Sequence, residues 1–153
     1  NVYGKRHIRT GHYATVVGIF EHQKINNLPL TITGDGSQRR DFTHVDDICD
    51  GLIAMAQETW NADVFNLGRS DNYSVLDIAK MFQPQEIEFI PSRKGEAINT
   101  LADISFTKEK LGWIPEIHLD QMIEEMVAYD LDEAKQNALL KNHGYKVSPI
   151  KER

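Results

Sequence analysis

The residues best suited to ligand chemistry lie in one stretch, Gly34 to Asp47, which reads GDGSQRRDFTHVDD. Within it, a Gly-Asp-Gly turn precedes two adjacent arginines, Arg39 and Arg40. A guanidinium group is a planar fork of donors that matches phosphate oxygens in pairs, and it keeps its proton at any working pH. A turn that brings such a group to a cleft would therefore suit a diphosphate. The alternative is a β-hairpin with exposed arginines, which composition alone favours.

A second candidate segment is Pro91 to Glu96, which reads PSRKGE. Arg93 and Glu96 lie on either side of a glycine bend and could address two ends of one ligand. The arginine would attract phosphates, and the carboxylate would accept hydrogen bonds from a pair of ribose hydroxyls. From these residues alone, a solvated charged loop is an equally good interpretation.

Three motifs follow one another in an order that resembles a known family: Asn1-Val2-Tyr3-Gly4, the Gly34 to Asp47 stretch and Pro91 to Glu96. Together they resemble the C-terminal half of the extended short-chain dehydrogenase/reductases, the NAD-dependent nucleotide-sugar epimerases and dehydratases. The resemblance extends over roughly residues 1 to 130. It implies an α/β fold that is the substrate-binding part of such an enzyme, with a fragment of the Rossmann sheet and most of the Rossmann domain missing.

The resemblance implies substrate-binding roles for Asn1, Thr33, Arg40, Arg93 and Glu96, and no catalytic, cofactor-binding or metal-binding residue. Arg40 and Arg93 would bind the nucleoside diphosphate and Glu96 the ribose, while Asn1 would donate to the phosphates or the sugar. Thr33 ends the strand whose backbone meets the pyrimidine edge in this family. Many relatives carry an aromatic residue there, so the identity of the base stays open.

Arg39 and Arg40 should point to opposite faces, because side chains alternate along a strand. Only one of them can then enter a pocket, and the family leaves the position of Arg39 variable. We therefore expect Arg39 to be a surface residue. The alternative for Arg40 is a surface salt bridge.

Two motifs with which this family uses its cofactor do not occur in the sequence. The ten glycines form no G-x-G-x-x-G or G-x-x-G-x-x-G pattern, and no tyrosine has a lysine four residues further on. We expect NAD to act in the intact enzyme but not to bind this chain alone, which should be inactive. The alternative is a non-catalytic, truncated module that binds a nucleotide sugar or pairs with a partner.

The resemblance also implies a reaction in the intact enzyme, namely transient oxidation of the hexose at C4. A UDP-hexose 4-epimerase is favoured, and a 4,6-dehydratase or a decarboxylase of the same superfamily is the alternative. A UDP-sugar is accordingly the expected ligand.

The composition limits the possible binding partners and the expected cellular compartment. With 17 basic and 23 acidic residues the net charge is −6, which opposes non-specific binding to nucleic acids. Cys49 is the sole cysteine, so no intrachain disulfide can form and a cytoplasmic location is expected. No apolar run approaches the roughly 20 residues of a membrane span. The histidines show no zinc-binding spacing.

Hydrophobic periodicity predicts the elements that position these residues. Helices are expected over 13–26, from Asp46 or Asp47 as N-cap, from a Ser74–Asp77 capping box to near Pro84, from Asp103 to Leu111, and from Leu119 onward. The second of these should be buried along its Ile48, Leu52 and Met55 side. Strands are expected over 30–33, 41–45, 64–67 and 86–90.

The domain prediction is a nucleotide-sugar-binding region over 1–140 and a polar tail over 141–153. Val64 to Leu67 should join a larger parallel sheet. Because an exposed strand edge invites pairing with another copy, a homo-oligomer is also expected.

Overall fold

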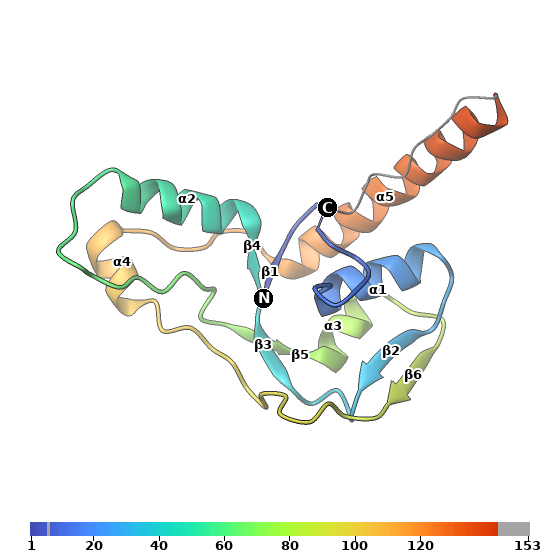
Figure 1. Ribbon diagram of the computed structural model, residues 1–153, viewed down its shortest axis with the longest axis horizontal. Helices are drawn as coiled ribbons and strands as arrows, with labels where there is room; N and C mark the ends of the chain where they lie inside the picture. Colours follow the sequence, from blue (N-terminus) through green and yellow to red (C-terminus); the bar gives the residue numbers. More distant parts are fainter. Residues whose placement is uncertain (6, 144–153) are drawn as a thin grey trace.

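The computed structural model describes residues 1–5 and 7–143 and shows a mixed α/β arrangement (Figure 1), which confirms the predicted fold class. The strands are β1 (Val2–Tyr3), β2 (Leu30–Thr33), β3 (Arg39–Asp41), β4 (Thr43–His44), β5 (Asn72–Ser74) and β6 (Ile87–Ile90). The helices are α1 (Val16–Ile25), α2 (Val45–Ala56), α3 (Val75–Met81), α4 (Ser105–Leu111) and α5 (Leu119–Asn142). None of the helices in this part of the chain is long and apolar enough to cross a membrane.

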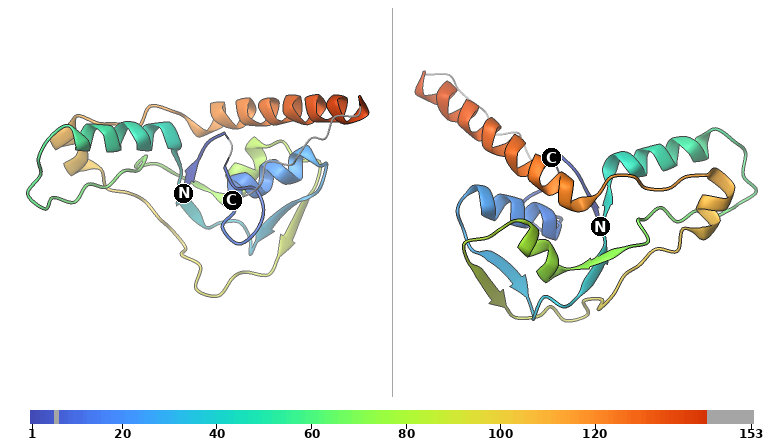
Figure 2. Two further views of the ribbon diagram at one scale, coloured as in Figure 1. Left: turned by 45° about the horizontal axis from the view of Figure 1, so that its top comes forward. Right: turned by 180° about the vertical axis from the view of Figure 1, so that it is seen from behind.

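The strands form three two-stranded sheets. β1 pairs with β4 and β2 with β6, both in parallel, while β3 pairs with β5 in the antiparallel sense. In Figure 1, α1 and α3 lie against the β2–β6 pair, and α2 and α4 lie together at the other end of the molecule. Both views in Figure 2 show α5 extending away from this body. β3 and β4 therefore connect the two ends of the molecule.

The main core lies where α1, α3 and the first part of α5 meet β2. Its buried members include Phe20, Ile32, Ile78 and Ile123, all at most 1% exposed. The rings of Phe20 and Phe82 pack edge to face, with their centroids 5.9 Å apart. This packing holds β2 in place, and the C-terminal end of β2 is where the candidate site begins.

The turn after β2 and the start of α3 match their predictions. Gly34 and Gly36 have φ angles of 63° and 75°, which glycine adopts without steric cost. A Cβ on Gly36 would also lie 2.9 Å from Cγ2 of Ile32. Ser74 and Asp77 form the predicted capping box. The hydrogen bond from Ser74 lowers the pKa of Asp77.

The predicted N-cap of α2 is wrong. His44 is the N-cap, and its Nδ1 accepts a hydrogen bond from the Asp46 amide at 3.2 Å. Asp47 instead accepts from the amides of Glu116 and Ile117, at 3.0 and 3.1 Å. Asp47 thus anchors the segment before α5, a contact between residues about seventy positions apart that local sequence patterns do not reveal.

The predicted burial of the apolar side of α2 is confirmed only in part. Ile48 and Met55 are half-buried, whereas Leu52 and Ile53 are 53% and 57% exposed. α2 packs through Asp47 and Gly51, and a Cβ on Gly51 would lie only 2.7 Å from Leu67 Cδ2. An amphipathic helix buries its apolar stripe only where another element covers it. Within residues 1–5 and 7–143, the part of this stripe formed by Leu52 and Ile53 is left uncovered.

Residues 64–67 do not form the predicted strand. Val64 is 81% exposed, and the Phe65 ring packs instead against Trp60 and Phe106, with centroids 4.8 and 5.3 Å away. A strand needs a hydrogen-bonded neighbour, and none pairs with this segment in the described part of the chain. Pairing of strand edges between copies stays a prediction.

Several predicted boundaries shift by a few residues. The helix expected from residue 13 begins at Val16, and the extended segment expected over 41–45 ends where α2 begins at Val45. Ile104, rather than Asp103, is the N-cap of α4, although Asp103 Oδ1 still accepts from the Ser105 amide at 2.9 Å. Of the predicted tail 141–153, the first two residues belong to α5, and residues 144–153 lie outside the described part.

Candidate functional site

One cavity of about 270 Å³ is lined by all five predicted binding residues. The parallel pairing of β2 with β6 places Thr33 opposite Ile90, so the loop after β6 leaves the sheet beside the end of β2. That loop carries Arg93 and Glu96. Asn1 and Arg40 complete the polar part of the lining from the N-terminus and β3. Four segments of the chain therefore converge on one space.

Three side chains of the cavity lining, those of Thr33, Arg40 and Glu96, are connected by hydrogen bonds. Arg40 Nη2 donates to Glu96 Oε1 at 3.2 Å, and Arg40 Nη1 donates to the Arg39 carbonyl at 2.8 Å. The other carboxylate oxygen, Glu96 Oε2, lies 3.5 Å from the Thr33 hydroxyl. The Arg40 side chain is only 12% exposed. Arg40 is thus held at the cavity rather than extended into solvent.

The two adjacent arginines point to opposite sides of β3, as predicted. Arg39 lies opposite Ser74 and Arg40 opposite Tyr73 in the antiparallel pair. The Arg39 guanidinium bonds to the side chain and carbonyl of Asn72, and one of its nitrogens lies 3.8 Å from Asp77 Oδ2. Arg39 does not line the cavity.

Arg93 differs from Arg40 because no hydrogen bond or ion pair to residues 1–5 or 7–143 holds its exposed side chain. Its charge is therefore available to an anion that enters the cavity. Arg40 and Arg93 thus give the cavity two cationic groups of donors, and Glu96 gives it one carboxylate.

The other residues that line the cavity are not predicted binding residues. They are Ala14, Thr15, Val16, Ile19, Phe20, Thr31, Val75 and Ile90. The Thr15 hydroxyl is buried, without a hydrogen-bond partner in the described part of the chain. The first of these residues lie at the start of α1, where unpaired amides make a helix end electropositive. The predicted start of a helix near residue 13 is the only sequence signal for the contribution of α1.

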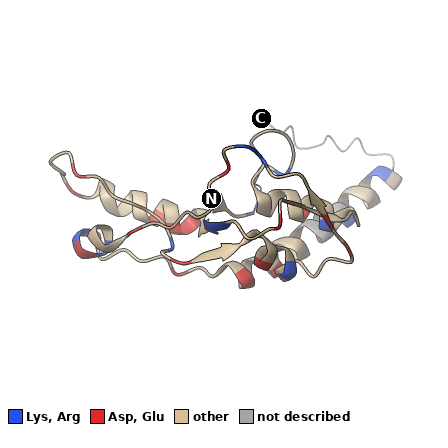
Figure 3. Ribbon diagram, turned by 90° about the horizontal axis from the view of Figure 1, so that it is seen from below, with Lys and Arg blue, Asp and Glu red and all other residues tan. Residues whose placement is uncertain are grey.

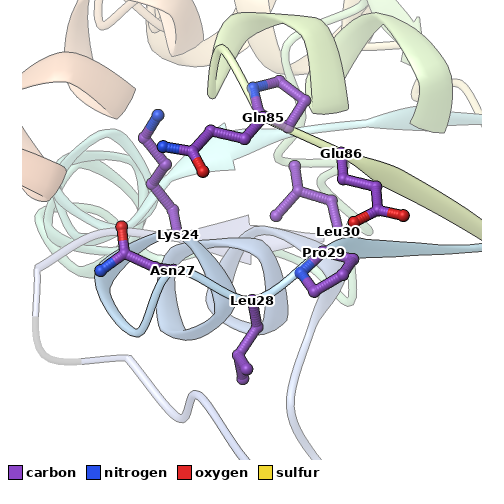
Figure 4. Close-up of a pocket in the computed structure, with 8 residues that line it drawn as sticks. Lys24, Asn27, Leu28, Pro29, Leu30, Gln85 and Glu86 are labelled. Atoms are coloured by element: carbon purple, nitrogen blue, oxygen red, sulfur yellow. The ribbon is translucent and has the colours of Figure 1, made fainter.

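A second hollow, of about 70 Å³, lies at the far end of the same strand pair and is shown in Figure 4. Its lining comes from the end of α1 and the segments that lead into β2 and β6, namely Lys24, Asn27, Leu28, Pro29, Leu30, Pro84, Gln85 and Glu86. It has about a quarter of the volume of the first cavity, and no predicted binding residue lines it. We therefore do not regard it as a candidate nucleotide-binding site.

The distribution of charged residues and the lack of a metal-binding group among the described residues also bear on the site. Figure 3 shows acidic and basic segments interspersed along the ribbon, so a positive site on this acidic chain is local. No group of histidine, cysteine, aspartate and glutamate side chains in the described residues could hold a metal ion.

The described residues do not fit a dinucleotide. A dinucleotide-binding fingerprint places its glycines between a strand and a helix, so that the pyrophosphate meets the helix N-terminus. Gly34 and Gly36 instead lie between two strands, β2 and β3.

Comparison with known proteins identifies the family. Residues 1–68 match the model of the NAD dependent epimerase/dehydratase family. The fold also matches a crystal structure of UDP-glucose 4-epimerase from Thermotoga maritima with UDP-glucose, at a TM-score of 0.81 and 32% identity. That match covers 88% of this chain and 44% of the solved one. The chain belongs to the NAD-dependent epimerase/dehydratase family. The resemblance seen in the three sequence motifs is confirmed.

Other members of the epimerase/dehydratase family are similar over parts of the chain. UDP-glucuronic acid decarboxylase 1 of Arabidopsis thaliana is 35% identical over 118 residues, which is 74% of this chain and 27% of that protein. GDP-mannose 4,6-dehydratase of Vibrio cholerae is 48% identical over 67 residues, 44% of this chain and 15% of that protein. The chain thus spans less than half the length of each of these relatives.

Proposed function

We propose that the cavity binds the nucleoside diphosphate of a nucleotide sugar, and that the chain is the substrate-binding part of an NAD-dependent epimerase or dehydratase. One observation carries the proposal. Asn1, Thr33, Arg40, Arg93 and Glu96, which come from four separate segments, line a single cavity.

Each polar residue then has a role that its chemistry allows. Arg40 and Arg93 bind the diphosphate from two sides, because guanidinium donors match phosphate oxygens. A guanidinium group carries more N–H donors than the two that Arg40 uses on Glu96 and Arg39, so Arg40 can bind phosphate without releasing either. Glu96 accepts from the ribose hydroxyls. Asn1 donates its side-chain amide to the phosphates or the sugar.

The nucleotide serves as a handle for the sugar. Binding energy gathered on the diphosphate and ribose fixes where the sugar lies, and a reacting carbon held in one place reacts faster than a free one. The chain supplies this positioning and no catalytic residue. We therefore expect it to be inactive by itself, with NAD bound elsewhere in the intact enzyme.

For the reaction of the intact enzyme we favour a UDP-hexose 4-epimerase, because the Thermotoga maritima protein that shares this fold is a UDP-glucose 4-epimerase. The Arabidopsis relative supports a decarboxylase and the Vibrio relative a 4,6-dehydratase as the second candidates. A UDP-sugar is the proposed ligand in the first two cases. The exposed free thiol of Cys49 is compatible with the proposed cytoplasmic location.

Calorimetric titration of the 153-residue chain with UDP, UMP and NAD tests the proposal. We expect UDP to bind about tenfold or more tightly than UMP, because UMP lacks the phosphate that reaches the second guanidinium. NAD should give no measurable heat. Micromolar NAD affinity, or equal affinities for UDP and UMP, would contradict the proposed site.

A further inference from the structure

Gln38, which does not line the cavity, is bonded to a residue that does. Its side-chain Nε2 donates to two oxygens of Thr33, the backbone carbonyl and the hydroxyl, each at 3.0 Å. A carbonyl oxygen can only accept a hydrogen bond. The amide end of Gln38 that faces Thr33 must therefore be the NH₂ group, which settles the orientation of the side chain.

This orientation decides what the Thr33 hydroxyl can do. A hydroxyl has one hydrogen, and the Gln38 NH₂ group occupies an acceptor position on the oxygen. The hydrogen of Thr33 is then left for another acceptor. Glu96 Oε2, which also belongs to the cavity lining, accepts it at 3.5 Å. Gln38 thus makes Thr33 a donor directed at the carboxylate.

Glu96 is held at both of its oxygens. Arg40 donates to Oε1 at 3.2 Å, and the Thr33 hydroxyl faces Oε2. Arg40 fixes only one oxygen, about which the carboxylate can still turn, and it keeps this bond when it also binds a diphosphate. The Thr33 hydroxyl fixes the second oxygen and so the orientation of the carboxylate, and Gln38 fixes the direction in which that hydroxyl donates.

We propose that Gln38 is a positioning residue that acts through Thr33 to hold Glu96 against the ribose, and so determines how strongly the site prefers ribonucleotides to 2′-deoxyribonucleotides. The inference rests on the proposed function, in which Glu96 accepts from the ribose hydroxyls. Gln38 itself would not touch the ligand.

The test compares the affinities of the 153-residue chain for UDP and 2′-deoxy-UDP in wild type and in Gln38→Met. Methionine keeps the length of the side chain but removes its donors. Gln23→Met is the matched control, because Gln23 also bonds to a threonine of the same strand: its Nε2 donates to the Thr31 hydroxyl at 2.8 Å, and its Oε1 accepts from the Thr31 amide at 3.1 Å. No hydrogen bond in the described part of the chain links Thr31 to Glu96. Both ligands are measured on one sample, so any loss of folded protein cancels in the ratio.

We expect wild type to prefer UDP about tenfold, since one charge-assisted hydrogen bond is lost with the 2′-hydroxyl. Gln38→Met should reduce this preference to about threefold or less, and Gln23→Met should leave it at the wild-type level. In a Thr33→Val background, Gln38→Met should change the ratio no further.

An unchanged ratio in Gln38→Met, or an equal fall in Gln23→Met, would overturn the inference while the proposed site stands. If wild type binds neither ligand, or binds both equally, the proposed role of Glu96 fails, and the inference fails with it.

Discussion

Replacing Arg40 with alanine should weaken UDP binding by about ten- to a hundredfold, because a hydrogen bond to a charged partner contributes about 1.5–3 kcal/mol. Arg93→Ala should have a similar effect. The two arginines reach the cavity from different segments and would bind one diphosphate from two sides. Calorimetry with UDP measures both effects, and melting temperatures show whether each variant remains folded.

The adjacent arginine provides the matched control. Arg39 has the same side chain one position away, but it bonds to Asn72 and faces Asp77 instead of the cavity. Arg39→Ala should therefore change UDP affinity much less than Arg40→Ala. If Arg39→Ala were the most damaging of the three variants, the nucleotide would have to bind on the opposite face of β3.

Replacing Asp41 with alanine should lower the free energy of unfolding by about 3–5 kcal/mol. Asp41 is 8% exposed, and its carboxylate accepts from the amides of Arg69, Ser70 and Ala102 at 2.8, 3.1 and 3.1 Å. The Thr43 hydroxyl donates to it at 3.3 Å. Alanine would leave these donors without an acceptor in a site largely closed to water. The carboxylate also fixes the end of β3, on which Arg40 lies.

Urea unfolding measures the loss, and two further variants define its origin. Asp41→Asn keeps the shape but turns one oxygen into a donor, so it should lose part of the stability. Asp35→Ala removes an exposed carboxylate that, within the described part of the chain, accepts bonds only from Ser37 of its own turn. If Asp41→Ala were no more damaging than Asp35→Ala, the carboxylate would not connect β3 to the neighbouring loops as described.

The features predicted correctly from the sequence are those fixed by short spacings. Gly34 and Gly36 mark a turn because each needs a positive φ. Ser74 and Asp77 cap a helix because they are three residues apart. Arg39 and Arg40 diverge because a strand alternates. In each case the residues that determine the structure lie within a few positions of one another, so the sequence pattern itself contains the physical cause.

The features that were missed depend on contacts between distant segments. Asp47 looked like a helix cap because nothing in its surroundings indicates that Glu116 and Ile117 lie beside it. Leu52 and Ile53 of α2 are exposed although periodicity predicts them to be buried, because periodicity shows only that a helix has an apolar side and not what covers it. Gln38 was overlooked for the same reason, since its role depends on the side chain of Thr33 and the loop that carries Glu96.

A crystal structure of the chain with UDP tests the central claim most directly. The diphosphate should lie within hydrogen-bonding distance of Arg40 and Arg93, with the ribose hydroxyls at Glu96. UDP bound instead on the Arg39 face of β3, or in the hollow beside Lys24 (Figure 4), would contradict the account.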